Sequence, residues 1–200
     1  MKRLTILLFA SLFVAIGCTK TGSDSGSAIT PPPPPPPQDT FTRYTIKSGE
    51  QSSSHNPFVP VNVTELKFVV KFDSTAIYST QNPANQADVN KLYGFADNGK
   101  HHQQYSARIG WRYFENKLTL HGYVYNNSVR TIADLGEVTI GKEHHCAIII
   151  EGNKYRFKMD TAQLLMSRTA TTPTSMGYKL FPFFGGNEMA PHDIHIWIKP

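Results

Sequence analysis

Alternation of apolar and polar side chains at every second position is the feature that most restricts how residues 41–200 can fold. The same two-residue period recurs in five segments: 66–72, 105–113, 118–125, 154–159 and 194–198. Successive side chains of a β-strand point to opposite faces, so this period is typical of half-buried antiparallel strands. The pattern predicts an all-β domain, an antiparallel two-sheet sandwich of the jelly-roll type.

Short turn sequences separate these segments. Glu115-Asn116 and Gly152-Asn153 each lie between two alternating runs, as expected of tight β-hairpin loops. Residues 161–168 are ambiguous, because the apolar residues clustered there suit either a short helix or a further strand. The turns support a sheet made largely of hairpins.

One segment carries a resemblance to a known family. Residues 141–160, GKEHHCAIIIEGNKYRFKMD, resemble the central hairpin of concanavalin-like (laminin-G-like) jelly rolls. Those domains often run from a histidine through an apolar strand, an acidic-glycine turn and a second apolar strand to an aspartate. The closing run 192–198, HDIHIWI, is similar to the final strand that such domains return to the sheet. The resemblance implies a concanavalin-like fold and leaves the activity open.

The amino-terminal residues have the layout of a secretion signal. Lys2 and Arg3 precede an apolar run over 4–16 that is too short for a transmembrane helix, which needs about 20 residues. The run ends in Ala15-Ile16-Gly17-Cys18 and resembles a bacterial lipoprotein signal, although leucine is commonest where Ala15 stands. This resemblance implies a lipid on Cys18 that anchors the protein in the cell envelope, where we expect the outer membrane. An ordinary secretory signal is the alternative.

A linker connects this signal to the predicted domain. Residues 19–30 are small and polar, and Pro31–Pro37 are seven consecutive prolines. A polyproline helix rises about 3.1 Å per residue, so this run predicts a stiff spacer of about 20 Å; a ligand for a proline-binding groove is the alternative. We therefore expect a signal peptide over 1–17, a tether over 18–40 and a β-sandwich over 41–200.

The charge of the chain argues against nucleic acid as a partner. The net charge is +5, and removing Lys2 and Arg3 from the 20 basic residues leaves 18 against 15 acidic residues. This small excess is spread along the sequence, whereas nucleic-acid-binding proteins concentrate basic residues on one face or helix. We expect the membrane and a polysaccharide as partners instead.

Several residues predicted on outward faces suggest a ligand-binding strip. The candidates combine arginine, histidine and aromatic side chains: Arg108, Arg112, His121, Tyr123, Tyr125, His195 and Trp197. If their strands share a sheet, the rings can stack on sugars and the guanidinium groups can bind carboxylates or sulfates. We expect a non-catalytic glycan-binding or envelope-binding module. The same side chains also suit exposed strands with no ligand, or a structural or protein-interaction module.

An enzymatic alternative is a polysaccharide lyase acting on an acidic polysaccharide. Jelly-roll alginate lyases use arginines, a histidine and a tyrosine to remove a proton beside a uronate carboxylate. In this chain Arg108 and Arg112 could hold the carboxylate, with His121 as base and Tyr123 or Tyr125 as acid. Glycoside hydrolysis is disfavoured, because no predicted strand carries the closely spaced pair of carboxylates that it needs. No catalytic residue is assigned.

The remaining cysteine and the histidine pairs carry no chemistry of their own. Cys146 lies in an apolar run and is expected to be a small buried residue rather than a nucleophile. His101-His102 and His144-His145 are adjacent, and neighbours on a strand point to opposite faces, so neither pair alone holds a metal. We predict no cofactor. Calcium is compatible with loop carboxylates of jelly rolls, but no ligand is assigned.

Overall fold

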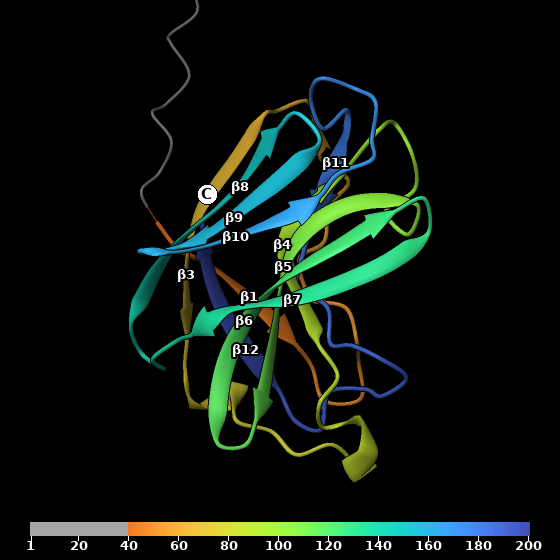
Figure 1. Ribbon diagram of the computed structural model, residues 1–200. Coiled ribbons are helices and arrows are strands. Elements are labelled where there is room, and N and C mark those ends of the chain that lie inside the picture. Colours follow the sequence, from red (N-terminus) through yellow and green to blue (C-terminus); the bar gives the residue numbers. More distant parts are fainter. Residues whose placement is uncertain (1–39) are drawn as a thin grey trace, which may run out of the picture. The chain divides into compact units, whose positions relative to one another are not determined.

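The structure is a computed structural model that describes residues 40–200; the predicted signal, Cys18 and Pro31–Pro37 lie outside the described residues. Two six-stranded antiparallel sheets pack face to face, which confirms the predicted sandwich (Figure 1). Within the described part, no helix is long and apolar enough to cross a membrane.

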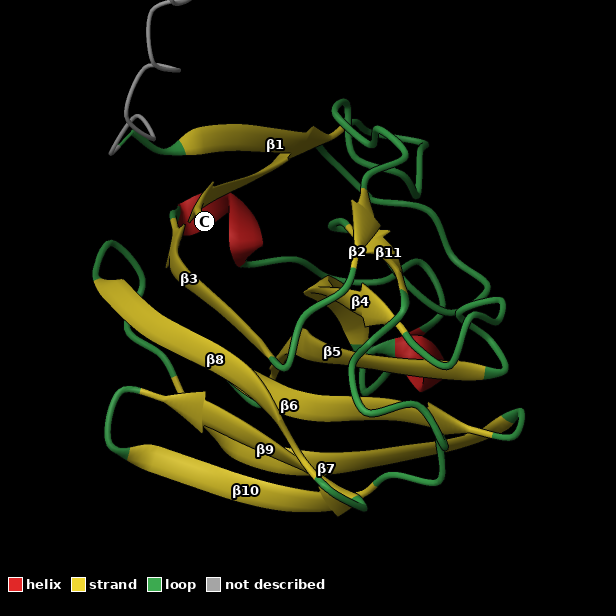
Figure 2. Ribbon diagram, turned by 90° about the horizontal axis from the view of Figure 1, so that it is seen from above, coloured by secondary structure: helices red, strands yellow, loops and turns green. Residues whose placement is uncertain are grey.

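The first sheet, called the β3 sheet, has the strand order β1-β12-β3-β8-β9-β10. Its strands are β1 (Thr42–Ile46), β12 (Ile194–Lys199), β3 (Glu65–Phe72), β8 (Glu143–Glu151), β9 (Lys154–Met159) and β10 (Ala162–Ser167). Figure 2 shows β1 and β10 at its opposite edges. The ambiguous segment over 161–168 is therefore mainly a strand.

The second sheet, called the β5 sheet, has the order β2-β11-β4-β5-β6-β7. Its strands are β2 (Pro60–Val61), β11 (Gly177–Leu180), β4 (Asn90–Ala96), β5 (Tyr105–Phe114), β6 (Lys117–Asn126) and β7 (Val129–Glu137). Two 3₁₀ turns, η1 (Ser74–Ala76) and η2 (Pro83–Asn85), lie in the connection from β3 to β4.

The core lies between the sheets and takes its side chains from the inward positions of the alternating strands. From the β5 sheet, Ile109, Trp111 and Leu120 are completely buried. Phe72 of the β3 sheet meets Trp111 with 5.6 Å between ring centroids. Each buried side chain of this size contributes about 1.5–3 kcal/mol by leaving water. The alternation in the sequence thus indicates which face of each strand packs into the core between the sheets.

Both predicted hairpin loops are present. Glu115 and Asn116 join β5 to β6 with positive φ angles of 50° and 59°, the backbone of a type I′ turn. Gly152 has φ of 59° between β8 and β9, in the segment that resembles the concanavalin-like hairpin. The closing strand β12 returns between β1 and β3, as that resemblance implied.

A buried ion pair joins β4 to the end of β10. Asp97 is inaccessible to solvent and accepts bonds from Arg168 Nε at 2.8 Å and from the Tyr155 hydroxyl. Arg168 also donates to several backbone carbonyls, including that of Thr172 at 2.7 Å. Every charge in this cluster is matched, as a buried ion pair requires.

Candidate functional site

The outer face of the β5 sheet assembles five of the seven predicted ligand-binding residues. β5 and β6 are paired so that Arg108 lies opposite Tyr123, Gly110 opposite His121, and Ser106 opposite Tyr125. The inward neighbours of these residues fill the core, so their own side chains lie on the face away from it. Arg112 follows on the same face of β5.

His195 and Trp197 do not belong to this face. They lie on β12, which pairs with β1 and β3 in the other sheet. There Lys71 Nζ lies 5.9 Å from the centre of the Trp197 ring, and His195 Nδ1 lies 3.1 Å from the hydroxyl oxygen of Thr45. The expectation of a single strip of seven residues is wrong, because a two-residue period identifies the face of a strand but not the sheet that receives it.

Arg108 is the most unusual residue of the outer face. Its side chain is 6% exposed, and no carboxylate, carbonyl or hydroxyl among residues 40–200 pairs with the guanidinium. Its Cζ lies 5.8 Å from the centre of the Tyr123 ring. Burial lowers the pKa of Arg108 to about 10. Burial alone does not account for the missing partner of Arg108, because Arg168 is equally buried and forms an ion pair with Asp97.

A glycine on the neighbouring strand leaves space for the side chain of Arg108. Gly94 of β4 lies directly opposite it, and a side chain there would place its Cβ within 2.5 Å of Arg108 Cβ. A bulge between Lys91 and Tyr93 then turns both Leu92 and Tyr93 into the core and leaves Lys91 on the outer face. The sheet therefore places two cations side by side.

Further cations surround Arg108. Lys91 Nζ lies 5.7 Å from the centre of the Tyr123 ring, and burial together with Arg108 and Arg130 lowers the pKa of Lys91 to about 8. Arg112 donates one bond to the Ala87 carbonyl at 3.0 Å, while its Nε is buried without a partner. Repulsion among these cations is unfavourable in the free protein, and a bound anion would reduce it.

His121 and the tyrosines supply groups that can hold or move protons. His121 Nδ1 lies 2.8 Å from Asp134 Oδ1. Burial, reinforced by Arg112, lowers the pKa of His121 and so favours the neutral imidazole. Burial raises the pKa of Tyr123, which keeps its hydroxyl protonated.

Two hollows open on this face. One of about 340 Å³ is lined by residues that include Lys91, Arg112, His121 and Arg130, and one of about 300 Å³ by residues that include Arg108. Lys91 lines the first hollow, and its Nζ lies 5.5 Å from the centre of the Phe183 ring, which lines the second. The two hollows can serve as neighbouring binding positions along the sheet.

Sequence reasoning missed several residues of this face: Phe58, Lys91, His102, Arg130, Tyr178 and Lys179. The outward position of Lys91 could not be predicted from the two-residue period, because the bulge interrupts the alternation of β4. Arg130 sits on β7 opposite Tyr125, two positions from the hairpin, and could have been placed by extending the alternation from β6.

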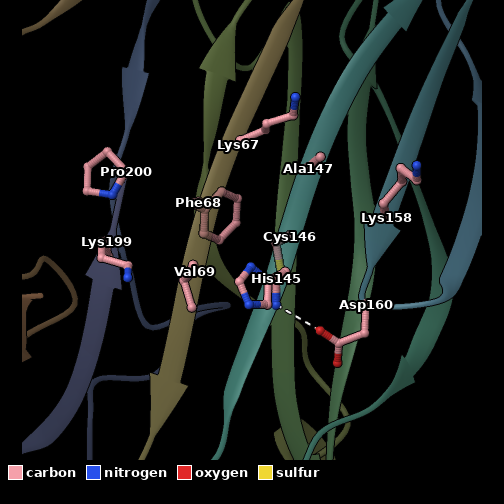
Figure 3. A pocket seen from close by; sticks show the side chains of 10 residues that line it. All are labelled: Lys67, Phe68, Val69, His145, Cys146, Ala147, Lys158, Asp160, Lys199 and Pro200. Carbon is pink, nitrogen blue, oxygen red and sulfur yellow. Dashed lines mark hydrogen bonds between the residues drawn. The ribbon is translucent and has the colours of Figure 1, made fainter. Parts of the chain in front are cut away.

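A separate hollow of about 340 Å³ lies on the outer face of the β3 sheet (Figure 3). It brings His145, Cys146 and Asp160 together, but these do not form a nucleophilic triad. Cys146 is a buried core residue whose thiol pKa is raised by burial, and Asp160 accepts the backbone N–H of His145 at 2.8 Å. The interpretation of Cys146 as a small buried residue is confirmed.

The residues that the structure describes contain no group of three or more histidine, cysteine, aspartate or glutamate side chains suited to a metal ion. The histidine pairs make other contacts. His102 Nδ1 lies 2.9 Å from the Tyr178 hydroxyl, and His144 Nδ1 lies 2.8 Å from Asp160 Oδ2.

Comparison with known proteins identifies the fold. No protein-family model and no curated protein sequence matches the chain. Among solved structures, alginate lyase vAL-1 from Chlorella virus is similar with a TM-score of 0.51 and 10% identity over 80% of this chain and 82% of the lyase. Alginate lyase AlyC3 is similar with a TM-score of 0.53 and 8% identity over 79% of this chain and 72% of the lyase. A glycoside hydrolase family 16 endo-glucanase from Bacteroides ovatus is similar with a TM-score of 0.51 and 9% identity over 80% of this chain and 79% of the enzyme.

These similarities place the chain in a structural class. It has a jelly-roll fold, which it shares with these lyases and this glycoside hydrolase. At such low identities the shared property is the fold.

Proposed function

We propose that the outer face of the β5 sheet binds an acidic polysaccharide and that Arg108 receives one of its carboxylates. The observation that carries this proposal is the buried guanidinium of Arg108 without a counter-charge among residues 40–200. A buried cation is costly unless it is paired, and a planar guanidinium matches a carboxylate with two parallel hydrogen bonds. A ligand carboxylate would supply the missing partner.

The surroundings of Arg108 favour a sugar polymer over a small anion. In the adjoining hollow three cations, Lys91, Arg112 and Arg130, outnumber two carboxylates, those of Asp88 and Asp134. The remaining positive charge suits a ligand with repeated negative charges. Tyr125, which is half-buried, adds aromatic surface; its ring centroid lies 5.9 Å from that of the buried Tyr123. The fold similarity to alginate lyase AlyC3, solved also in complex with dimannuronate with a TM-score of 0.51, is consistent with an acidic sugar.

A lyase is the second candidate, because neutral His121 lies beside Arg112 and near the protonated Tyr123. In such a reaction a base takes the proton from the carbon that bears the uronate carboxylate. The electrons of that C–H bond form a C=C bond, the glycosidic C–O bond breaks, and an acid protonates the departing oxygen. Hydrolysis by paired carboxylates is disfavoured, since β4, β5 and β6 carry no aspartate or glutamate.

The test is electrophoresis of the purified protein through native gels cast with alginate, pectate or a neutral glucan. We expect retardation in an acidic gel and its loss in Arg108→Met, whereas equal migration of both proteins in every gel contradicts the proposal. Ultraviolet absorbance of an unsaturated uronate product, absent in His121→Ala with retardation preserved, would establish the lyase instead of the binding module.

We also propose that this domain is carried on the bacterial cell envelope by a lipid at Cys18, probed by labelling the cells with a radioactive fatty acid. The signal-like sequence up to Cys18 and the proline run support this proposal. Two or more acyl chains suffice for stable anchoring. Labelling should disappear in Cys18→Ala, and labelling that persists in that variant contradicts the lipid anchor.

A further inference from the structure

We propose that Phe58 and Tyr178 form a second subsite, which stacks against another sugar ring of the acidic polysaccharide whose carboxylate Arg108 binds. This inference rests on the proposed function and adds that the ligand is an oligosaccharide lying along the sheet. The pair of rings is called the Phe58 platform below.

The Phe58 platform pairs one exposed aromatic ring with one half-buried ring. Phe58 precedes β2 and is 75% exposed, the most exposed large apolar side chain among residues 40–200. Its ring centroid lies 5.4 Å from that of Tyr178 on β11, with an angle of 35° between the planes. The Tyr178 hydroxyl is held by His102, which donates its backbone N–H at 3.2 Å. One ring is thus fixed by the sheet and the other lies beside it in solvent.

The platform is continuous with the Arg108 position. The hollow of about 300 Å³ that contains Arg108 is also lined by Phe58 and Tyr178. A second hollow, of about 590 Å³, begins at the same two rings and continues past Gly99 to Met176, which is 48% exposed. Phe58 and Tyr178 therefore line both hollows, where a polymer that extends from Arg108 toward Met176 would pass.

The charge of these two hollows favours an acidic ligand. Their linings contain three cationic side chains, Lys100, Arg108 and Lys179, and no aspartate or glutamate. Burial lowers the pKa of His102 to about 4, so its ring is neutral and adds no charge. An acidic chain is attracted along this path, while the apolar faces of its sugar rings can lie on Phe58 and Tyr178. A neutral apolar protein segment would leave the cations without partners.

Calorimetric titration of the purified protein with uronate oligosaccharides of increasing length tests the inference. Phe58→Ala should bind the disaccharide as the unmodified protein does and should bind longer oligosaccharides about three- to tenfold more weakly, the usual contribution of one aromatic contact. Phe58→Tyr should retain full affinity. Met189→Ala, which removes another exposed apolar side chain, is the control and should change nothing.

The outcomes separate this inference from the proposed function. If the unmodified protein binds no uronate of any length, the proposed function fails and the platform with it. If it binds but Phe58→Ala is unchanged at every length, the platform alone is refuted. An equal loss for the disaccharide and the longer chains also refutes a separate subsite, because Phe58 would then act on the Arg108 position.

Discussion

Replacing Arg108 by methionine should make the protein more stable and less able to bind its ligand. Methionine matches the arginine side chain in length as far as Nε and has no charge, so it removes the buried cation and largely keeps the packing of the stem. Burial lowers the pKa of Arg108 from the usual value of an arginine to about 10. Because a tenfold change in a protonation equilibrium is worth about 1.4 kcal/mol, the charged side chain costs the folded state about 3 kcal/mol. We expect Arg108→Met to recover about 1–3 kcal/mol of this cost.

Urea denaturation of both proteins measures this effect. The midpoint should move to higher urea with an unchanged slope, since the surface exposed on unfolding stays the same. Arg168→Met is the matched control: Arg168 is equally buried but paired with Asp97, and its loss should cost about 3–5 kcal/mol by leaving that carboxylate alone. If Arg108→Met is destabilised as strongly as Arg168→Met, the guanidinium makes stabilising contacts and the reasoning is refuted.

Three further predictions concern single side chains. Because the pKa of Lys91 is lowered to about 8, its amine is charged below that pH and neutral above it, so titrations should show uronate affinity falling as pH rises through about 8 in the unmodified protein but not in Lys91→Arg. Gly94→Ala would place a Cβ 2.2 Å from the Ala107 carbonyl oxygen and should lower the free energy of unfolding by about 1–3 kcal/mol, measured in urea. The buried Cys146 thiol should react with iodoacetamide only after denaturation, and rapid labelling of the native protein would contradict its burial.

The sequence predicted the strands in which apolar and polar side chains alternate clearly. β5 and β6 alternate cleanly, so the outward positions of Arg108, His121 and Tyr123 followed from the period alone. β4 does not alternate, because its bulge turns both Leu92 and Tyr93 inward, and Lys91 was missed with it.

Relations between distant segments could not be predicted in the same way. Trp197 alternates as clearly as Tyr123, yet strand order places it on the other sheet, and no local pattern encodes that order. Phe58 lies in an irregular segment, where no period marks which side chains face a ligand. Its partner Tyr178 is far along the chain and meets it through the pairing of β11 with β2.

The pairing of β1 with β12 has a consequence for how the domain can be connected to other structures. Thr42 pairs with Ile198, so the first and last strands of the described chain run side by side at one edge of the β3 sheet. The candidate binding face belongs to the other sheet. A fusion partner, a surface support or a fluorescent label can therefore be attached at either end of the described domain without being joined to the strands of the proposed binding face.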